Sequence, residues 1–191
     1  MTSRRHALAQ LLCGSAPLAW PAAARALSWL ATPAVGEARL VDHDGRTRHL
    51  ADLLQAPRPV AVSFFYTGCA TVCPPQTALL MACCQQWKTR PALRELLMLS
   101  ISVDPLNDGP SQLRAYGQRF GLPLGEAQGW LLLSGAPREV QRALTAFDVP
   151  TRPDAHPALL WLGDPVRGRW TRTSALNPPQ LNGDLFEALR Q

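Results

Sequence analysis

Length, composition and charge restrict what this chain can be. Its 191 residues are enough for one domain with a buried core but leave little room for two. With 47% hydrophobic and 17% charged residues, the composition excludes a disordered chain. The net charge of +5 falls to +2 without the first 26 residues, and the remaining arginines form no basic run, which excludes a nucleic-acid-binding protein.

The first 26 residues have the features of an export signal. Arg4 and Arg5 form a twin arginine ahead of a modest apolar stretch, as in Tat-type signals, and Ala24-Arg25-Ala26 resembles a signal peptidase site. The stretch is too short and interrupted for a membrane span, although an uncleaved leader would act as an anchor. We therefore expect a signal peptide over residues 1–26, a mature domain over 27–191 and a periplasmic location. Membrane contact is expected only if the leader is retained.

Segments typical of strands and helices alternate through the mature chain. The run from Pro59 to Tyr66 is almost wholly apolar, which predicts a central strand buried on both faces. The other predicted elements are a strand and Asp-Gly turn over 38–46, helices over 72–87, 110–120, 138–147 and 178–190, strands over 96–103 and 130–133, and a hairpin formed by 158–162 and 168–173. This order predicts a single α/β domain with a central mixed β-sheet flanked by α-helices.

Cys69 and Cys73 lie four residues apart, between the predicted central strand and the next helix. On one helical turn, this spacing brings both side chains to the same face, so the sulfurs could share a metal ion or form a disulfide. Ligands often bind at this edge of α/β sheets, and the helix N-terminus favours the thiolate form. Two soft thiolates fit copper(I), zinc or redox exchange, and two structural cysteines or an inert disulfide are the alternative.

The identity of a third ligand would distinguish among these chemistries, and His156 is the candidate for that ligand. It lies in the loop directly ahead of the predicted strand 158–162. In a thioredoxin-like sheet, that loop faces the helix that follows the cysteines. A loop histidine taken alone is usually a solvated polar residue, so the position of His156 carries the hypothesis. We expect His43 and His49 to be surface residues.

Four other residues receive structural interpretations. Cys83 and Cys84 lie nearly three helical turns beyond the first cysteine pair, too far to share an ion with it, and are expected to be core or partly buried thiols. Asp104 ends a predicted strand before a proline, and Asp108-Gly109 is typical of a turn. Both aspartates could support the cysteine site or contact a partner, but we favour the interpretation that they serve the local backbone.

In order and spacing, four segments resemble the Sco/SenC family of copper-binding, thioredoxin-fold assembly proteins. They are Val41–Gly45, Phe64–Pro74 with its Cys-x3-Cys-Pro loop, Ser102–Pro110 with its Ser-Val-Asp-Pro-x-x-Asp segment, and His156–Asp164. The resemblance covers about residues 38–190. It implies a thioredoxin-like domain in which Cys69, Cys73 and His156 bind a copper ion, Cu(I) or Cu(II).

The resemblance also implies a function. A member would be a copper metallochaperone that helps to assemble the copper centre of a respiratory oxidase. Its partner would be the copper-site subunit of that oxidase or another copper chaperone, and we expect a monomer. The alternative is a thiol-disulfide oxidoreductase in which Cys69 and Cys73 are the redox-active pair that keeps target cysteines reduced. A peroxidase is disfavoured because neither cysteine follows a Pro-x3-Thr-x2 motif.

Two features depart from the family pattern. Ala70-Thr71 stands where the family usually has Pro-Asp, which removes a carboxylate beside the cysteines and would change the affinity or the redox potential. Pro157 directly follows His156. Thioredoxins have a cis-proline near this loop, so a cis bond here would make the site more like that of a redox enzyme.

Overall fold

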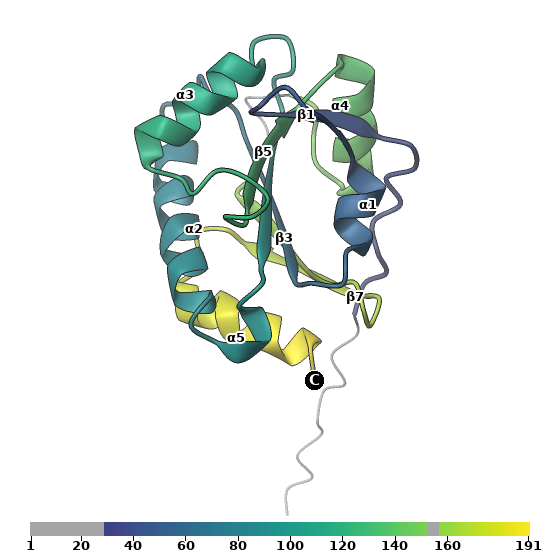
Figure 1. Ribbon diagram of the computed structural model, residues 1–191, viewed down its shortest axis with the longest axis vertical. Helices are drawn as coiled ribbons and strands as arrows, with labels where there is room; N and C mark the ends of the chain where they lie inside the picture. The colour runs from purple at the N-terminus through teal and green to yellow at the C-terminus, as the bar shows by residue number, and fades with distance from the viewer. Residues whose placement is uncertain (1–28, 153–156) are drawn as a thin grey trace, which may run out of the picture.

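The computed structural model of the protein describes residues 29–152 and 157–191 (Figure 1). The predicted leader over residues 1–26 and the predicted ligand His156 lie outside the described residues. In chain order the elements are β1 (Arg39–Asp42), β2 (Thr47–His49), α1 (Leu50–Gln55), β3 (Val60–Phe65), α2 (Cys73–Trp87), a 3-10 turn (Pro91–Leu93), β4 (Leu97–Ser102), α3 (Pro110–Phe120), β5 (Trp130–Ser134), α4 (Pro137–Ala146), β6 (Leu159–Asp164), β7 (Arg169–Ser174) and α5 (Pro179–Leu189).

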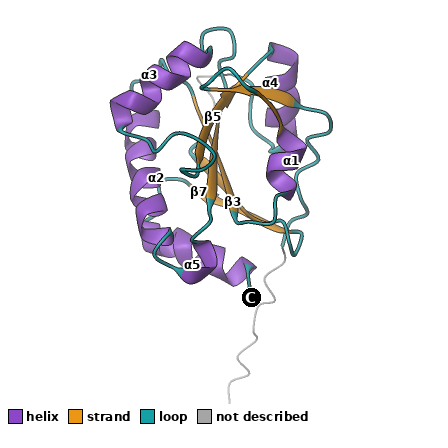
Figure 2. Ribbon diagram, in the orientation of Figure 1, coloured by secondary structure: helices purple, strands orange, loops and turns teal. Residues whose placement is uncertain are grey.

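The strands form one seven-stranded mixed sheet in the order β2-β1-β5-β4-β3-β6-β7. β3, β4 and β5 run parallel, whereas β6 pairs antiparallel with β3 and β7 pairs antiparallel with β6. Helices α1 and α4 cover one face of the sheet, and α2, α3 and α5 cover the other (Figure 1, Figure 2). The predicted α/β class, with a mixed sheet between helices in a single domain, is confirmed.

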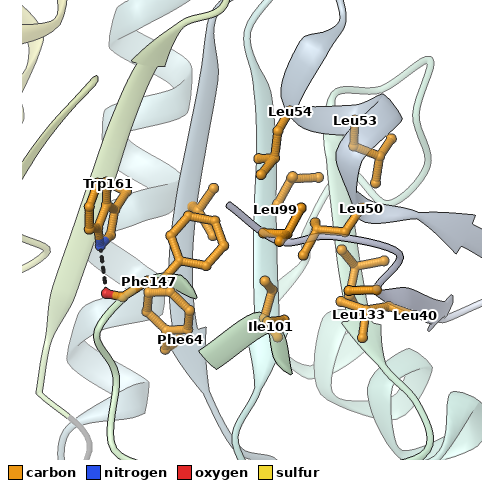
Figure 3. Close-up of a cluster of buried hydrophobic side chains, with 14 of the residues drawn as sticks. Leu40, Leu50, Leu53, Leu54, Phe64, Leu99, Ile101, Leu133, Phe147 and Trp161 are labelled. Atoms are coloured by element: carbon orange, nitrogen blue, oxygen red, sulfur yellow. Dashed lines mark hydrogen bonds between the residues drawn. The ribbon is translucent and has the colours of Figure 1, made fainter. Parts of the chain in front are cut away.

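The central strand β3 is buried on both faces because helices cover both sides of the sheet. Val62 and Phe64 point into the cluster under α1 and α4, where the Phe64 ring packs edge-on against Phe147 with centroids 5.5 Å apart (Figure 3). Ala61 and Phe65 point into the opposite cluster, under α2, α3 and α5. The strand therefore runs through the core and ends directly before the loop that carries Cys69.

Two elements near the N-terminal end were not predicted. β2 has only three residues, all polar, and α1 has only six, too few for a helix to be stable by itself. α1 forms because Leu50, Leu53 and Leu54 are buried against the sheet. α1 therefore depends on contacts with distant parts of the chain, whereas β2 forms by pairing with the neighbouring strand β1.

The first described residues already form hydrogen bonds with the sheet, at β7. The backbone N–H of Leu30 donates to the carbonyl of Trp170 on β7 at 2.7 Å, and the N–H of Trp170 donates back at 3.0 Å. The indole Nε1 of Trp170 donates to Thr32 Oγ1 at 3.0 Å. Between residues 29 and 191, leaving aside 153–156, no helix combines the length and the apolar character needed to cross a bilayer.

The prediction that His43 is a surface residue was wrong, whereas His49 is exposed as expected. The His43 side chain is only 3% exposed. Its backbone N–H donates to the Leu132 carbonyl at 3.1 Å, because β1 pairs with β5, and its own carbonyl accepts from Arg114 at 2.9 Å. The pairing of strands far apart in the sequence thus draws this residue into the interior.

Candidate metal centre

The loop between β3 and α2 brings the two cysteines together. Cys73 is the first residue of α2, and Pro74 and Pro75 follow in the first turn, where no intrahelical N–H bond is lost. Cys69 lies in the turn before the helix and not on the first helical turn, and its backbone N–H donates to the Tyr66 carbonyl at 3.2 Å. They still converge, because the Cys73 backbone N–H donates to Cys69 Sγ at 3.3 Å.

Both thiols are buried, and neither is part of a disulfide. Cys69 is 4% exposed and Cys73 is fully buried, and both belong to the apolar cluster under α2, α3 and α5. A metal ion or a reacting sulfur therefore approaches them in a setting with little water. In such a setting, direct hydrogen bonds decide which sulfur carries a negative charge.

The surroundings of the pair separate the two pKa values. Burial raises the pKa of Cys69, but hydrogen bonds from the Cys73 thiol and from the backbone N–H groups of Cys73, Thr71 and Val72 outweigh it and lower the pKa to about 7. Burial and the hydrogen bond with Cys69 raise the pKa of Cys73 to about 12. Cys69 is therefore the thiolate of the pair near neutral pH, and Cys73 is its hydrogen-bond donor.

Asp108 ties this loop to the end of β4. The carboxylate is 1% exposed and accepts hydrogen bonds from the Thr67 backbone N–H at 2.9 Å, from Thr67 Oγ1 at 2.5 Å and from Ser102 Oγ at 2.5 Å. The favoured interpretation, that Asp108 serves its own turn, was therefore incomplete, because the carboxylate also holds the cysteine loop to β4. Its spacing in the Ser-Val-Asp-Pro-x-x-Asp segment was the available signal, but nothing in the sequence pointed to Thr67 as its partner.

Tyr116 on α3 lies in the same apolar cluster as the two cysteines. Its ring packs on Phe65 with centroids 4.8 Å apart, and its hydroxyl lies 2.6 Å from Thr77 Oγ1 on α2. Burial raises the pKa of Tyr116 to about 12 against the lowering effect of the Thr77 hydrogen bond, and negative charge on Cys73 and Cys69 adds to the rise. The phenol thus stays neutral beside the thiol pair.

His156 lies outside the described residues, as does its bond to Pro157, so its role stays a prediction. The described part of the chain fixes where β6 begins. β6 is antiparallel to β3, with Leu160 opposite Ser63, so the chain arrives at β6 on the edge of the sheet where β3 ends. Ala158 packs against the apolar cluster that contains Cys69 and Cys73.

The other two cysteines of α2 are structural. Cys83 and Cys84 are buried core thiols, as expected, and burial raises the pKa of each to about 12. Within the described ranges, no three His, Cys, Asp or Glu side chains are grouped closely enough to hold a metal ion. The described donors are therefore the two sulfurs, a soft set that fits copper(I) or zinc better than calcium or magnesium.

The sequence matches the model of the SCO1/SenC family over residues 30–160. It is 35% identical over 72 residues to the SCO1 protein homolog of Bacillus subtilis (strain 168), a match that covers 38% of this chain and 35% of that protein. It is 30% identical over 114 residues to the mitochondrial Protein SCO2 homolog of Homo sapiens, covering 60% of this chain and 40% of that protein. The matched region thus spans well under half the length of these two relatives.

Solved structures share the fold. BsSco, a member of the Sco family of cytochrome c oxidase assembly proteins, superposes with a TM-score of 0.69 at 23% identity, covering 85% of this chain and 95% of that one. The copper-bound ScoI of Bradyrhizobium japonicum superposes with a TM-score of 0.61 at 24% identity, covering 81% of this chain and 98% of that one. A SCO1/SenC family lipoprotein from Bacillus anthracis superposes with a TM-score of 0.65 at 23% identity, covering 86% of this chain and 97% of that one.

Proposed function

This chain belongs to the SCO1/SenC family, and from that premise we propose that it is an exported metallochaperone whose cargo is copper. One copper ion would be bound by Cys69, Cys73 and His156. The convergence of the two sulfurs, with the Cys73 N–H donating to Cys69 Sγ at 3.3 Å, is the observation that carries the proposal. The copper-bound ScoI of Bradyrhizobium japonicum, which has the same fold, supports the choice of metal.

The donor set suits a carrier of copper. Two thiolates hold Cu(I) well, and an imidazole as third ligand also tolerates Cu(II). The pKa of about 7 for Cys69 means that this ligand needs little deprotonation at neutral pH, whereas Cys73 must lose its proton when the metal binds. A site with only three protein ligands can pass its ion to a partner that offers more.

The partner would be the copper-site subunit of a respiratory oxidase or another copper chaperone. The assembly role of BsSco in cytochrome c oxidase biogenesis supports this part of the proposal. The twin arginine at Arg4-Arg5 supports export by a Tat-type signal, and the Bacillus anthracis protein of the same fold is a lipoprotein. The protein would act in the periplasm, tethered to the membrane if residues 1–26 are retained.

Anaerobic copper titration of the reduced protein tests the site. We expect about one copper per chain and a sulfur-to-Cu(II) charge-transfer absorption band that is lost in Cys69→Ser. His156→Ala should weaken binding at least about tenfold, because it removes one of three ligands. His49→Ala is the matched control, since His49 is exposed and should leave the titration unchanged. A band that persists in both ligand variants would refute the site.

A second function, thiol-disulfide exchange, is favoured by the separated pKa values of the pair. The Cys69 thiolate would attack a target disulfide and form a mixed disulfide while one target sulfur leaves as a thiolate. Cys73, once deprotonated, would then attack Cys69 Sγ, closing the Cys69–Cys73 disulfide and releasing the second target thiolate. The reduction potential of the pair is the measurement that decides. A value well below about −200 mV would fit a reductant of target cysteines, and a value near −120 mV would exclude that role.

A further inference from the structure

A small pocket opens on the surface beside the cysteine loop. It has a volume of about 220 Å³ and is lined by Thr67, Gln112, Ala115, Tyr116 and Arg119. Thr67 comes from the loop between β3 and α2, and the other residues come from α3. None of the lining residues is acidic, and two of them, Gln112 and Arg119, carry side-chain N–H donors.

Arg119 is held in place without a counter-ion. Its guanidinium carbon lies 4.7 Å from the centre of the Phe120 ring and 5.5 Å from that of Tyr116, so the two aromatic rings fix the side chain by cation–π contact. No carboxylate in residues 29–152 or 157–191 pairs with it, whereas Arg114 on the same helix pairs with Asp44 at 3.4 Å. Arg119 is exposed, so its planar set of donors faces solvent and is available to an anion.

The pocket adjoins the cysteines through two of its walls. Thr67 is two residues from Cys69, and Asp108 fixes its position through two hydrogen bonds. Tyr116 lies in the same apolar cluster as Cys69 and Cys73 and also lines the pocket. A molecule with one group in the pocket would therefore lie next to the cysteine loop.

We propose that this pocket binds a carboxylate of the partner protein with which Cys69 reacts. Arg119 and Gln112 would thereby select partners in which an acidic side chain lies next to the metal-binding or redox-active sulfur. This inference rests on the proposed function, in which Cys69 exchanges copper or electrons with another protein. Gln112 accepts from Ser111 Oγ at 2.8 Å through its Oε1 atom, which leaves its Nε2 hydrogens to donate. Two convergent donors and no acid in the lining suit a carboxylate.

Reaction rates of Cys69 with two disulfide reagents of different charge test this selectivity. The probes are 5,5′-dithiobis(2-nitrobenzoate), which carries two carboxylates, and 4,4′-dithiodipyridine, which is uncharged at pH 7.5. In each reaction the Cys69 thiolate attacks the reagent disulfide, a protein–reagent disulfide forms, and one half of the reagent leaves as a thiolate that takes the electron pair. Cys69→Ser gives the background from the other thiols. In Arg119→Gln, we expect the rate with the anionic reagent to fall about fivefold at low salt, with the neutral reagent unaffected.

The ratio of the two rates isolates the pocket, because any change in the acidity of Cys69 affects both reagents alike. Arg119→Lys should keep most of the ratio, and 0.5 M NaCl should reduce it in the wild-type protein. Arg138→Gln is the matched control, an exposed arginine at the start of α4 on the same edge of the sheet. An equal fall of the rate ratio in Arg138→Gln would mean that the overall positive charge of the protein attracts the reagent. Equal slowing of both reagents in Arg119→Gln would mean that Arg119 has a structural role. Either result would overturn the pocket.

Copper titration of the same variants separates this inference from the proposed function. If the wild-type protein binds no copper but Arg119→Gln still lowers the rate ratio, the metallochaperone proposal fails and the carboxylate pocket stands. If copper binds and the ratio does not change, the pocket fails and the copper site stands. We expect Arg119→Gln to bind copper as the wild-type protein does, because Arg119 offers no metal ligand.

Discussion

At the scale of single residues, the acidity of Cys69 is the property most open to measurement. Its thiolate is the reactive form, and its pKa is lowered to about 7. The alkylation rate of the reduced, metal-free protein by iodoacetamide should therefore rise with pH through a midpoint near 7. Cys73, Cys83 and Cys84 should stay unreactive over that range, because the pKa of each is raised to about 12. A midpoint near 9 for Cys69 in mass-spectrometric peptide analysis would contradict the hydrogen-bonded thiolate.

Asp108 has a second measurable effect. Asp108→Asn replaces an oxygen that accepts hydrogen bonds with an NH₂ group, which cannot accept from Thr67 or Ser102. The variant should lose about 1–3 kcal/mol in the free energy of unfolding, measured in urea. Asp104→Asn is the control, because Asp104 is only partly buried and, among the described residues, its carboxylate accepts from the side chain of Asn107 only. Equal losses in the two variants would show that Asp108 does not fix the cysteine loop.

At the scale of elements, the hairpin of β6 and β7 leaves no space at Gly163. A Cβ atom there would lie 2.5 Å from three carbons of the Trp170 ring, which is fully buried on the opposite strand. Gly163→Ala should lower the free energy of unfolding by about 1–3 kcal/mol through overpacking. Gly68→Ala is a matched control, since its Cβ would meet only Tyr66 ring carbons at 3.7 and 3.8 Å. A thermal or urea unfolding series compares the two variants directly.

The elements also show how far sequence reasoning reaches. β3, α2, α3 and the β6–β7 hairpin were predicted because each is long enough for its apolar pattern to be recognised. The short α1 and β2 were not, because α1 is stabilised by burial against the sheet and the three polar residues of β2 carry no apolar pattern. At the site, spacing and context identified Cys69 and Cys73, but not the bond from Thr67 to Asp108, which joins residues 41 positions apart. The pocket at Arg119 was missed for the same reason, since Thr67 and α3 meet only in the folded protein.

At the scale of the whole molecule, the described contacts place the start of the domain before residue 30. A chain that starts at Leu27 keeps the backbone hydrogen bonds between Leu30 and Trp170 and the bond from Trp170 to Thr32, so it should melt at the same temperature as the full chain. A chain that starts at Val35 loses all three bonds, about 2–3 kcal/mol, and should melt roughly 4–10 °C lower. Calorimetry of the two truncations checks the predicted boundary at residue 27. Equal melting temperatures would show that the segment before Val35 adds nothing to stability.

The pairing of β3 with β6 has a consequence for how fast a cargo can leave. The loop with Cys69 follows β3, His156 comes three residues before β6 in the sequence, and four paired positions from Val60 to Ser63 hold the two strands in register. The end of β3 and the start of β6 are therefore held at a fixed separation by the sheet itself. At the site proposed here, a metal ion would then be bound and released without the slow opening of the domain.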